Sequence, residues 1–114
     1  MLKAITGSLA SPGQTELLAR FFRGLSDPTR LRMVDYLLGG ERSVAELVKL
    51  VGAPQGRVSS HLAYLKWCSV VTSRRRGRNV YYSVVDERTA DLLSLVQAIL
   101  IRHVRHLASL AQIE

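Results

Sequence analysis

The sequence is poor in the features that mark secreted and membrane proteins. It contains one cysteine among 114 residues, so it cannot form an internal disulfide, and this is typical of the reducing cytoplasm. Residues 1–14 hold one lysine and only short apolar runs, unlike a signal peptide or a membrane anchor. The longest strongly apolar run, Leu92–Ile101, is broken by Ser94 and Gln97 and is too short to span a bilayer. We therefore expect a cytoplasmic protein with no membrane partner.

Acidic residues are also scarce, with 9 against 16 lysines and arginines, so the net charge at pH 7 is +7. This excess favours a polyanionic partner, which can be a nucleic acid or an acidic membrane surface. The sequence has no glycine-rich phosphate loop, and no catalytic base is recognisable for Cys68, so we expect no enzyme. The length and the hydrophobic fraction of 47% predict one globular domain with its own core.

The most informative stretch is Pro54–Cys68, which has the pattern of a helix with two unlike faces. Val58, Leu62 and Leu65 recur at helical spacing, and Pro54 suits a first helical position. Polar side chains gather in the first two turns, and the leading residues of such a helix can reach base edges and phosphates in a DNA major groove. The predicted DNA-binding residues of this helix are Gln55, Arg57, Ser59, Ser60 and His61. His61 has an alternative, which is to pack against the preceding helix.

The chain before this stretch alternates between helical patterns and strong breaks. We expect residues 1–14 to form a flexible N-terminal arm, which could be partly helical, and residues 15–25 to form a first helix. Asp27 is a good N-cap and Pro28 a good first residue for the next helix, which should end near Leu38, before two glycines.

A second short helix should open at Ser43, because Ser43 and Glu46 have the spacing of a capping box. This helix should end near Val51, and Gly52 and Ala53 then form the turn into Pro54–Cys68. Two short helices joined by a tight turn, the second one polar at its front, predict a helix-turn-helix.

After Cys68 the hydrophobic period changes from that of a helix to that of a strand. Ser69–Ser73 and Val80–Val85 are rich in β-branched and aromatic residues and predict two strands of a β-hairpin. The segment between them, Arg74–Asn79, contains four arginines, so the hairpin should act as a basic wing beside the helix-turn-helix. Its tip could follow phosphates or enter the minor groove. The predicted DNA-binding residues of the wing are Arg74, Arg75, Arg76 and Arg78.

The C-terminal part, residues 87–110, predicts one long helix with more apolar residues than a small domain can cover. We expect it to pack against a second copy, helped by the helix at 15–25, so that the protein is a homodimer. The predicted interface residues are Leu92, Val96, Ile99, Leu100, Val104 and Leu107. Residues 15–114 would then be one winged helix-turn-helix domain with dimerisation helices, mainly α with a small β-hairpin (α+β).

Three ordered motifs, Phe22–Met33, Val58–Leu65 and Arg75–Tyr82, resemble the ArsR/SmtB family of bacterial winged-helix repressors, many of which are metal sensors. The resemblance covers residues 16 to about 95. It implies a homodimer that binds a pseudo-palindromic operator in double-stranded DNA and responds to an inducer. It also implies that the recognition helix carries Gln55 to His61 and that the wing lies at 74–79.

The inducer is the point at which this sequence departs from the well-known family members. Their thiolate site would fall on Ser43–Ala45, which contains no sulfur, and Cys68 fits a buried small hydrophobe better than a ligand. A second family site on the last helix has an acid followed by histidine, but Arg88 stands where that histidine should be.

Two histidines further along the last helix offer a different metal site. His103 and His106 are three residues apart, which puts both imidazoles on one helix face. In an antiparallel dimer they could meet Asp86 or Glu87 of the other subunit, and such a ligand set suits nickel, zinc or cobalt, of which we expect nickel or zinc. The alternative is that His103 packs in the dimer stripe and His106 is solvated, with no metal bound.

Other functions remain open at this point. A regulator of the same fold could respond to redox change or to a partner protein instead of a metal. A winged-helix interaction module could use its basic face for a protein or for RNA. A cationic membrane-surface protein is a third class, but the longest helix is apolar rather than basic and amphipathic. We favour a DNA-binding repressor.

Overall fold

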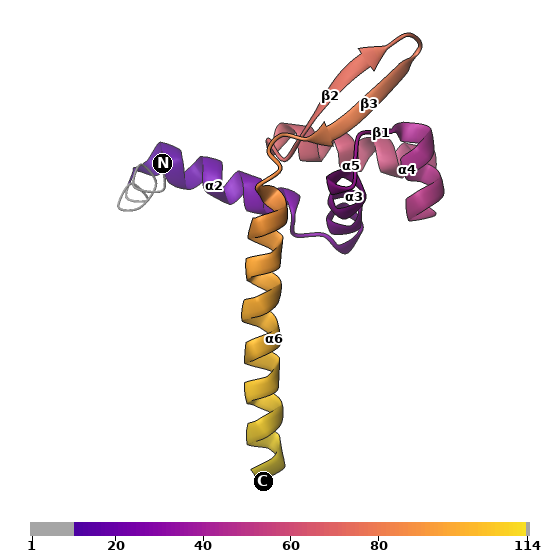
Figure 1. Ribbon diagram of the computed structural model, residues 1–114. Coiled ribbons are helices and arrows are strands. Elements are labelled where there is room, and N and C mark those ends of the chain that lie inside the picture. The colour runs from indigo at the N-terminus through magenta and orange to yellow at the C-terminus, as the bar shows by residue number, and fades with distance from the viewer. Residues whose placement is uncertain (1–10, 114) are drawn as a thin grey trace.

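The structure, a computed structural model, describes residues 11–113 as a helical body with a small sheet and one long projecting helix (Figure 1). The helices are α2 (Pro12–Gly24), α3 (Pro28–Leu38), α4 (Val44–Val51), α5 (Gln55–Trp67) and α6 (Thr89–Ile113). The strands are β1 (Arg42–Ser43), β2 (Val71–Arg76) and β3 (Asn79–Val84). The predicted class, mainly α with a small β-hairpin, is confirmed.

Local signals begin and end these helices as the sequence indicates. Asp27 accepts a hydrogen bond from the backbone N–H of Arg30 and caps α3, and this bond lowers the pKa of the Asp27 carboxyl. Ser43 and Glu46 form the expected capping box at the start of α4. Gly52 ends α4 with a φ of 73°, a left-handed conformation that glycine adopts without strain.

Several predicted boundaries were wrong by a few residues. The helix expected at 15–25 begins at Pro12, so part of the predicted arm is helical, and residues 1–10 lie outside the described chain. Pro54 is the N-cap of α5 and not its first helical residue. The last helix begins at Thr89 and not at residue 87, which leaves Asp86 and Glu87 in the preceding turn.

The sheet contains one strand more than predicted. β1 pairs antiparallel with β3, and β3 pairs antiparallel with β2, giving the order β1-β3-β2. The two residues of β1 could not be recognised as a strand in the sequence, because so short a segment shows no alternation. β1 joins the segment before α4 to the wing.

The core lies where α3, α4 and α5 meet the inner face of the sheet. Its fully buried members come from every one of these elements and include Met33, Leu47, Leu62 and Val71. Cys68 is 1% exposed and packs here as a small hydrophobe, as expected. Burial of Val58, Leu62 and Leu65 orients α5, since these three residues fix which side of the helix faces outward.

Only the first turns of α6 contact this body. Leu92 and Leu93 pack against the core, but the helix beyond them projects away from it (Figure 1). The Cα radius of gyration is 17.0 Å, against about 13 Å for a compact domain of this length. Among the described residues, no helix combines the length and the apolar character needed to cross a membrane.

The end of α2 touches the end of α5 at a glycine. A Cβ on Gly24 would lie 2.9 Å from the Cβ of Cys68 and 3.1 Å from a methyl group of Val70. Both distances are shorter than a comfortable contact, so any larger residue would push α2 away from α5.

We therefore expect Gly24→Ala to lower the free energy of unfolding by about 1–3 kcal/mol, as overpacking does in other cores. Gly56→Ala is the matched control, because its new Cβ would meet no atom within 4 Å and alanine favours the helix. Urea denaturation of both variants provides the measurement. Equal stability of the two would show that the α2–α5 contact relaxes without cost.

Candidate nucleic-acid interface

The outer side of α5 presents polar side chains to solvent. Gln55, Arg57, Ser59 and Ser60 are all exposed, because the buried stripe of Val58, Leu62 and Leu65 points the opposite way. Pro54 has no side chain that could cap the helix, so the first backbone N–H groups of α5 point outward beside these residues. The front of α5 can therefore bind phosphate through its backbone and present an amide and hydroxyls to base edges.

His61, the fifth residue predicted on this surface, is half-buried and turned toward α3. Its Nδ1 lies 3.5 Å from Nη1 of Arg30. This contact is with α3, two helices earlier in the chain, whereas the alternative stated for His61 was the preceding helix, α4. It separates His61 from the four exposed residues.

Arg30 is a structural residue that the sequence did not single out. Its Nε donates to the carbonyl of Gly24 at 2.8 Å, and its Nη2 donates to the carbonyl of Arg23 at 3.0 Å. Its guanidinium also lies 4.6 Å from the ring centre of Tyr64 on α5. One arginine thus joins the last carbonyls of α2 to α5. The partners lie six to 34 residues away in sequence, so no local pattern marks this role.

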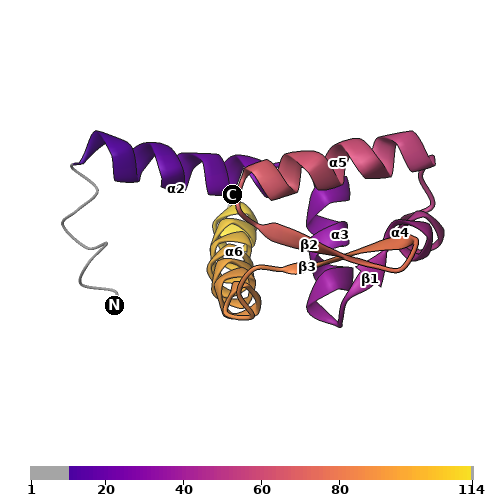
Figure 2. The same ribbon diagram turned by 90° about the horizontal axis from the view of Figure 1, so that it is seen from above.

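The hairpin of β2 and β3 stands beside α5 (Figure 2). The predicted tip was too long, because β2 continues to Arg76 and β3 begins at Asn79, which leaves Gly77 and Arg78 as the turn. Gly77 has a φ of 63°, as the tight turn requires. Lys66 of α5 donates to the hydroxyl of Ser73 at 2.7 Å and ties the helix to the wing.

Because β2 continues to Arg76, the arginines at 74, 75 and 76 lie within a strand and alternate between the two faces of the sheet. Val71, Ser73 and Arg75 alternate onto the face that covers α5, where Val71 is buried and Ser73 meets Lys66. Arg74 and Arg76 lie on the other face, which we call the outer face. Arg75 and Arg78 are exposed, and no ion pair of either is seen in the described part of the chain.

Glu41, just before β1, binds both arginines of the outer face. Its Oε2 and Oε1 accept from Nε and Nη2 of Arg74 at 2.6 and 2.9 Å, and its Oε1 accepts from Nη2 of Arg76 at 3.2 Å. The hydrogen bond from Arg74 holds the pKa of the Glu41 carboxyl below its ordinary value, and the pair raises the pKa of Arg74. Glu41 is far from the wing in sequence, so the pattern of charges did not reveal it.

The four residues proposed as metal ligands do not meet within one chain. Asp86 accepts a two-pronged ion pair from Arg88, with Nη2 2.6 Å from Oδ2, and the hydrogen bonds from Arg88 lower the pKa of Asp86 to about 2. His103 and His106 lie further along α6, where they line a shallow pocket with Ile99 and Arg102. Residues 11–113 contain no group of three or more histidine, cysteine or acidic side chains able to hold a metal.

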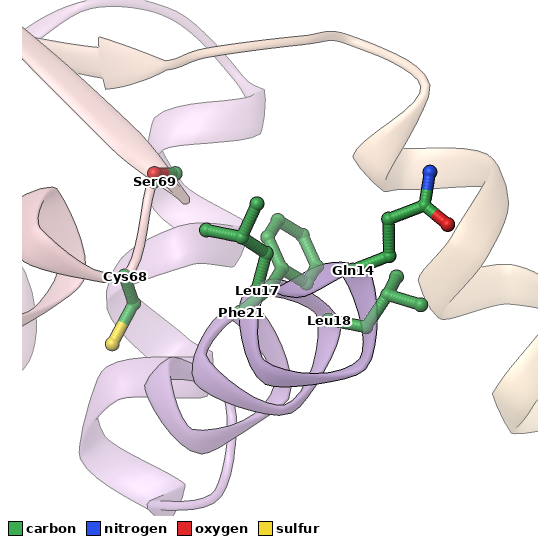
Figure 3. A pocket seen from close by; sticks show the side chains of 6 residues that line it. All are labelled: Gln14, Leu17, Leu18, Phe21, Cys68 and Ser69. Carbon is green, nitrogen blue, oxygen red and sulfur yellow. The ribbon is translucent and has the colours of Figure 1, made fainter. Parts of the chain in front are cut away.

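A second hollow lies between α2 and the end of α5. Gln14, Leu17, Leu18 and Phe21 line one side of it, and Cys68 and Ser69 line the other, around a volume of about 370 Å³ (Figure 3). The walls are almost entirely apolar, and the sulfur of Cys68 points away from the other labelled side chains. This hollow continues the apolar surface of α2 rather than forming a polar site.

A helix-turn-helix with an exposed polar recognition helix and a basic hairpin beside it defines a winged-helix protein of the DNA-binding class. Residues 27–73 match the family described as "Bacterial regulatory protein, arsR family". The chain is 45% identical over 100 residues to a probable mercury resistance operon repressor of Streptomyces lividans, covering 84% of this chain and 80% of the relative. It is 34% identical to a transcriptional repressor SmtB homolog of Synechocystis, covering 80% and 69%. The chain belongs to the ArsR/SmtB family of transcriptional regulators, which are DNA-binding proteins and not enzymes.

Solved structures of related proteins have the same fold. One is the homodimeric winged helix-turn-helix DNA-binding domain of Mb0332 from Mycobacterium bovis, with a TM-score of 0.74, 32% identity and coverage of 82% of this chain and 87% of that one. Another is Rv0081 of M. tuberculosis, with a TM-score of 0.74, 33% identity and coverage of 84% and 97%. These likenesses confirm the winged helix-turn-helix architecture predicted from the sequence.

Proposed function

We propose that this protein is a transcriptional repressor that binds a palindromic operator as a homodimer. One observation carries the proposal: the exposed front of α5 and the basic wing lie side by side on a body from which an apolar helix projects (Figure 1). The first pair of features suits a DNA half-site, and the helix suits a second copy of the chain. The repressors among the relatives support this function.

In this proposal α5 enters the major groove with its N-terminus leading. The backbone N–H groups at Gln55 and Gly56 meet a phosphate, the Gln55 amide can pair with adenine, and Arg57 can reach guanine or phosphate. Arg75 and Arg78 of the wing contact the neighbouring backbone or minor groove.

The exposed surface of α6 supports the dimer. Ile99 and Val104 are 66% and 61% exposed, and every residue from 94 to 110 is exposed. So many exposed apolar side chains on one helix are unfavourable in water and mark a surface that binds a partner. Of the six residues predicted at the interface, Val96, Ile99, Leu100, Val104 and Leu107 are exposed, whereas Leu92 is half-buried against its own core.

We also propose that the repressor responds to a divalent metal, nickel or zinc, bound by His103 and His106. These imidazoles are adjacent on α6, and His103 lies within the stripe that would face the second subunit. Two imidazoles need further ligands, which the partner subunit would supply. Glu87 suits that role better than Asp86, because Arg88 already occupies the Asp86 carboxylate. The mercury resistance repressor among the relatives supports a metal as the class of effector.

Base readout predicts unequal effects on two DNA duplexes. Gln55→Ala or Ser59→Ala should weaken binding to the operator by about 1–3 kcal/mol for each good base contact and should leave binding to a random duplex almost unchanged. Fluorescence anisotropy with duplexes from the protein's own promoter measures both. Equal losses on the two duplexes would mean that these side chains only position the helix.

Dimerisation through α6 predicts that a buried charge separates the subunits. Val96→Asp or Ile99→Asp should give monomers in sedimentation at micromolar concentration and should abolish operator binding, because the carboxylate would be buried without a partner. Ser94→Asp is the control, since residue 94 lies about 160° around the helix from Val96. A wild-type monomer would contradict the proposal.

If His103 and His106 bind a metal, removing these two histidines should abolish metal binding, whereas removing His61 should not. Calorimetric titration with nickel or zinc should show binding to the wild type and loss of binding in His103→Ala/His106→Ala. Affinity should fall as the pH drops and the imidazoles protonate. His61→Ala is the matched control and should bind like the wild type. Equal binding by wild type and double variant, or binding by neither, would exclude this site.

A further inference from the structure

On the outer face of the wing, one carboxylate, that of Glu41, binds two arginines, Arg74 and Arg76. The Glu41 carboxylate meets Arg74 through both of its oxygens and shares one of them with Arg76. Two-pronged pairs of this kind are the strong form of the arginine–carboxylate contact, and a phosphate group uses the same geometry. Arg76 also lies 5.1 Å from the ring centre of Tyr81, on the same face.

The sheet places these groups together through its register. Ser43 and Arg74 both pair with Tyr81, from opposite sides of β3, so their side chains share the outer face. Glu41 is two residues before Ser43 and therefore points to this face as well. Its side chain is 26% exposed, whereas Arg74 and Arg76 are 60% and 59% exposed, so the acid is held beneath the two arginines.

We propose that Glu41 is an intramolecular counter-ion that occupies Arg74 and Arg76 in place of DNA phosphates and so weakens sequence-independent binding. The inference rests on the DNA-binding function proposed above. Of the wing's four positive charges, Glu41 cancels one. It also takes up both of the arginines on the outer face, which leaves Arg75 and Arg78, without an ion pair among the described residues, as the phosphate ligands of the wing.

The effect on DNA follows from the nature of phosphate contacts. Each phosphate that a protein neutralises releases counterions and adds about 0.9 to the slope of log affinity against log salt concentration. Such contacts carry no sequence information, so arginines that bind an internal acid favour discrimination over affinity. Glu41 thereby raises the ratio of operator binding to random binding.

The test compares Glu41→Gln with Glu16→Gln. The control removes the same charge and also breaks an ion pair, that of Glu16 with Arg23 on α2, which lies on the opposite side of α6 from the wing (Figure 1). Relative to the control, Glu41→Gln should bind a random duplex about three- to tenfold more tightly, with a salt slope steeper by about one. Weaker binding, or binding equal to that of the control, would overturn the proposal, since a mere brace for the wing would lose affinity when removed.

Arginine variants in the wild-type background provide a second measurement, and this one does not depend on Glu41→Gln folding. Both Arg74→Ala and Arg75→Ala should lower the affinity for a random duplex. The fold loss caused by Arg74→Ala should be less than half of the fold loss caused by Arg75→Ala. In the Glu41→Gln background the cost of Arg74→Ala should rise, while that of Arg75→Ala should not change. Equal costs for the two arginines in the wild-type background would contradict the inference.

Heparin retention separates this inference from the proposed function. If the wild type binds no duplex at all, the DNA-binding proposal fails. Glu41→Gln should still leave a heparin column at higher salt than Glu16→Gln, because heparin is a polyanion without base sequence. Identical elution of the two variants would refute the counter-ion role.

Discussion

The contact between the end of α2 and the end of α5 is the constraint on which the rest of this structure depends. Gly24 allows the two helices to approach, because no side chain stands between it and Cys68. Arg30 then closes the junction by donating to the last carbonyls of α2 while its guanidinium lies over Tyr64 of α5. Arg20 of α2 adds a third contact, since its guanidinium lies 4.6 Å from the ring centre of Trp67 on α5.

This junction joins two surfaces of different chemical character. α2 and α6 carry exposed apolar residues, and α5 carries the exposed polar front, so the angle between the helices sets how a dimer would present two recognition helices. DNA with two half-sites on one face needs these helices about 34 Å apart.

Charge in this protein is arranged more selectively than its total of +7 indicates. Four of its arginines make ion pairs with acids in the described chain, and two of these, Arg74 and Arg76, share Glu41. Arg30 is engaged with backbone carbonyls and an aromatic ring. Arg57, Arg75 and Arg78 remain exposed near the front of α5 and the turn of the wing. Net charge therefore indicates the class of partner, whereas the structure shows which arginines are already paired with acids.

The sequence by itself determined the order and type of the main elements, because caps, glycine stops and apolar periodicity act within a few residues. The capping box at Ser43, the buried stripe of α5 and the hairpin all follow from such local signals. Only the tertiary structure decided the direction of His61, the partners of Arg30 and the two faces of the wing. Glu41 and Arg74 are 33 residues apart, and the shift of β2 to Val71–Arg76 moved its arginines relative to the predicted turn. Strand register and long-range pairing depend on how the sheet packs on the helices, which no local pattern of residues contains.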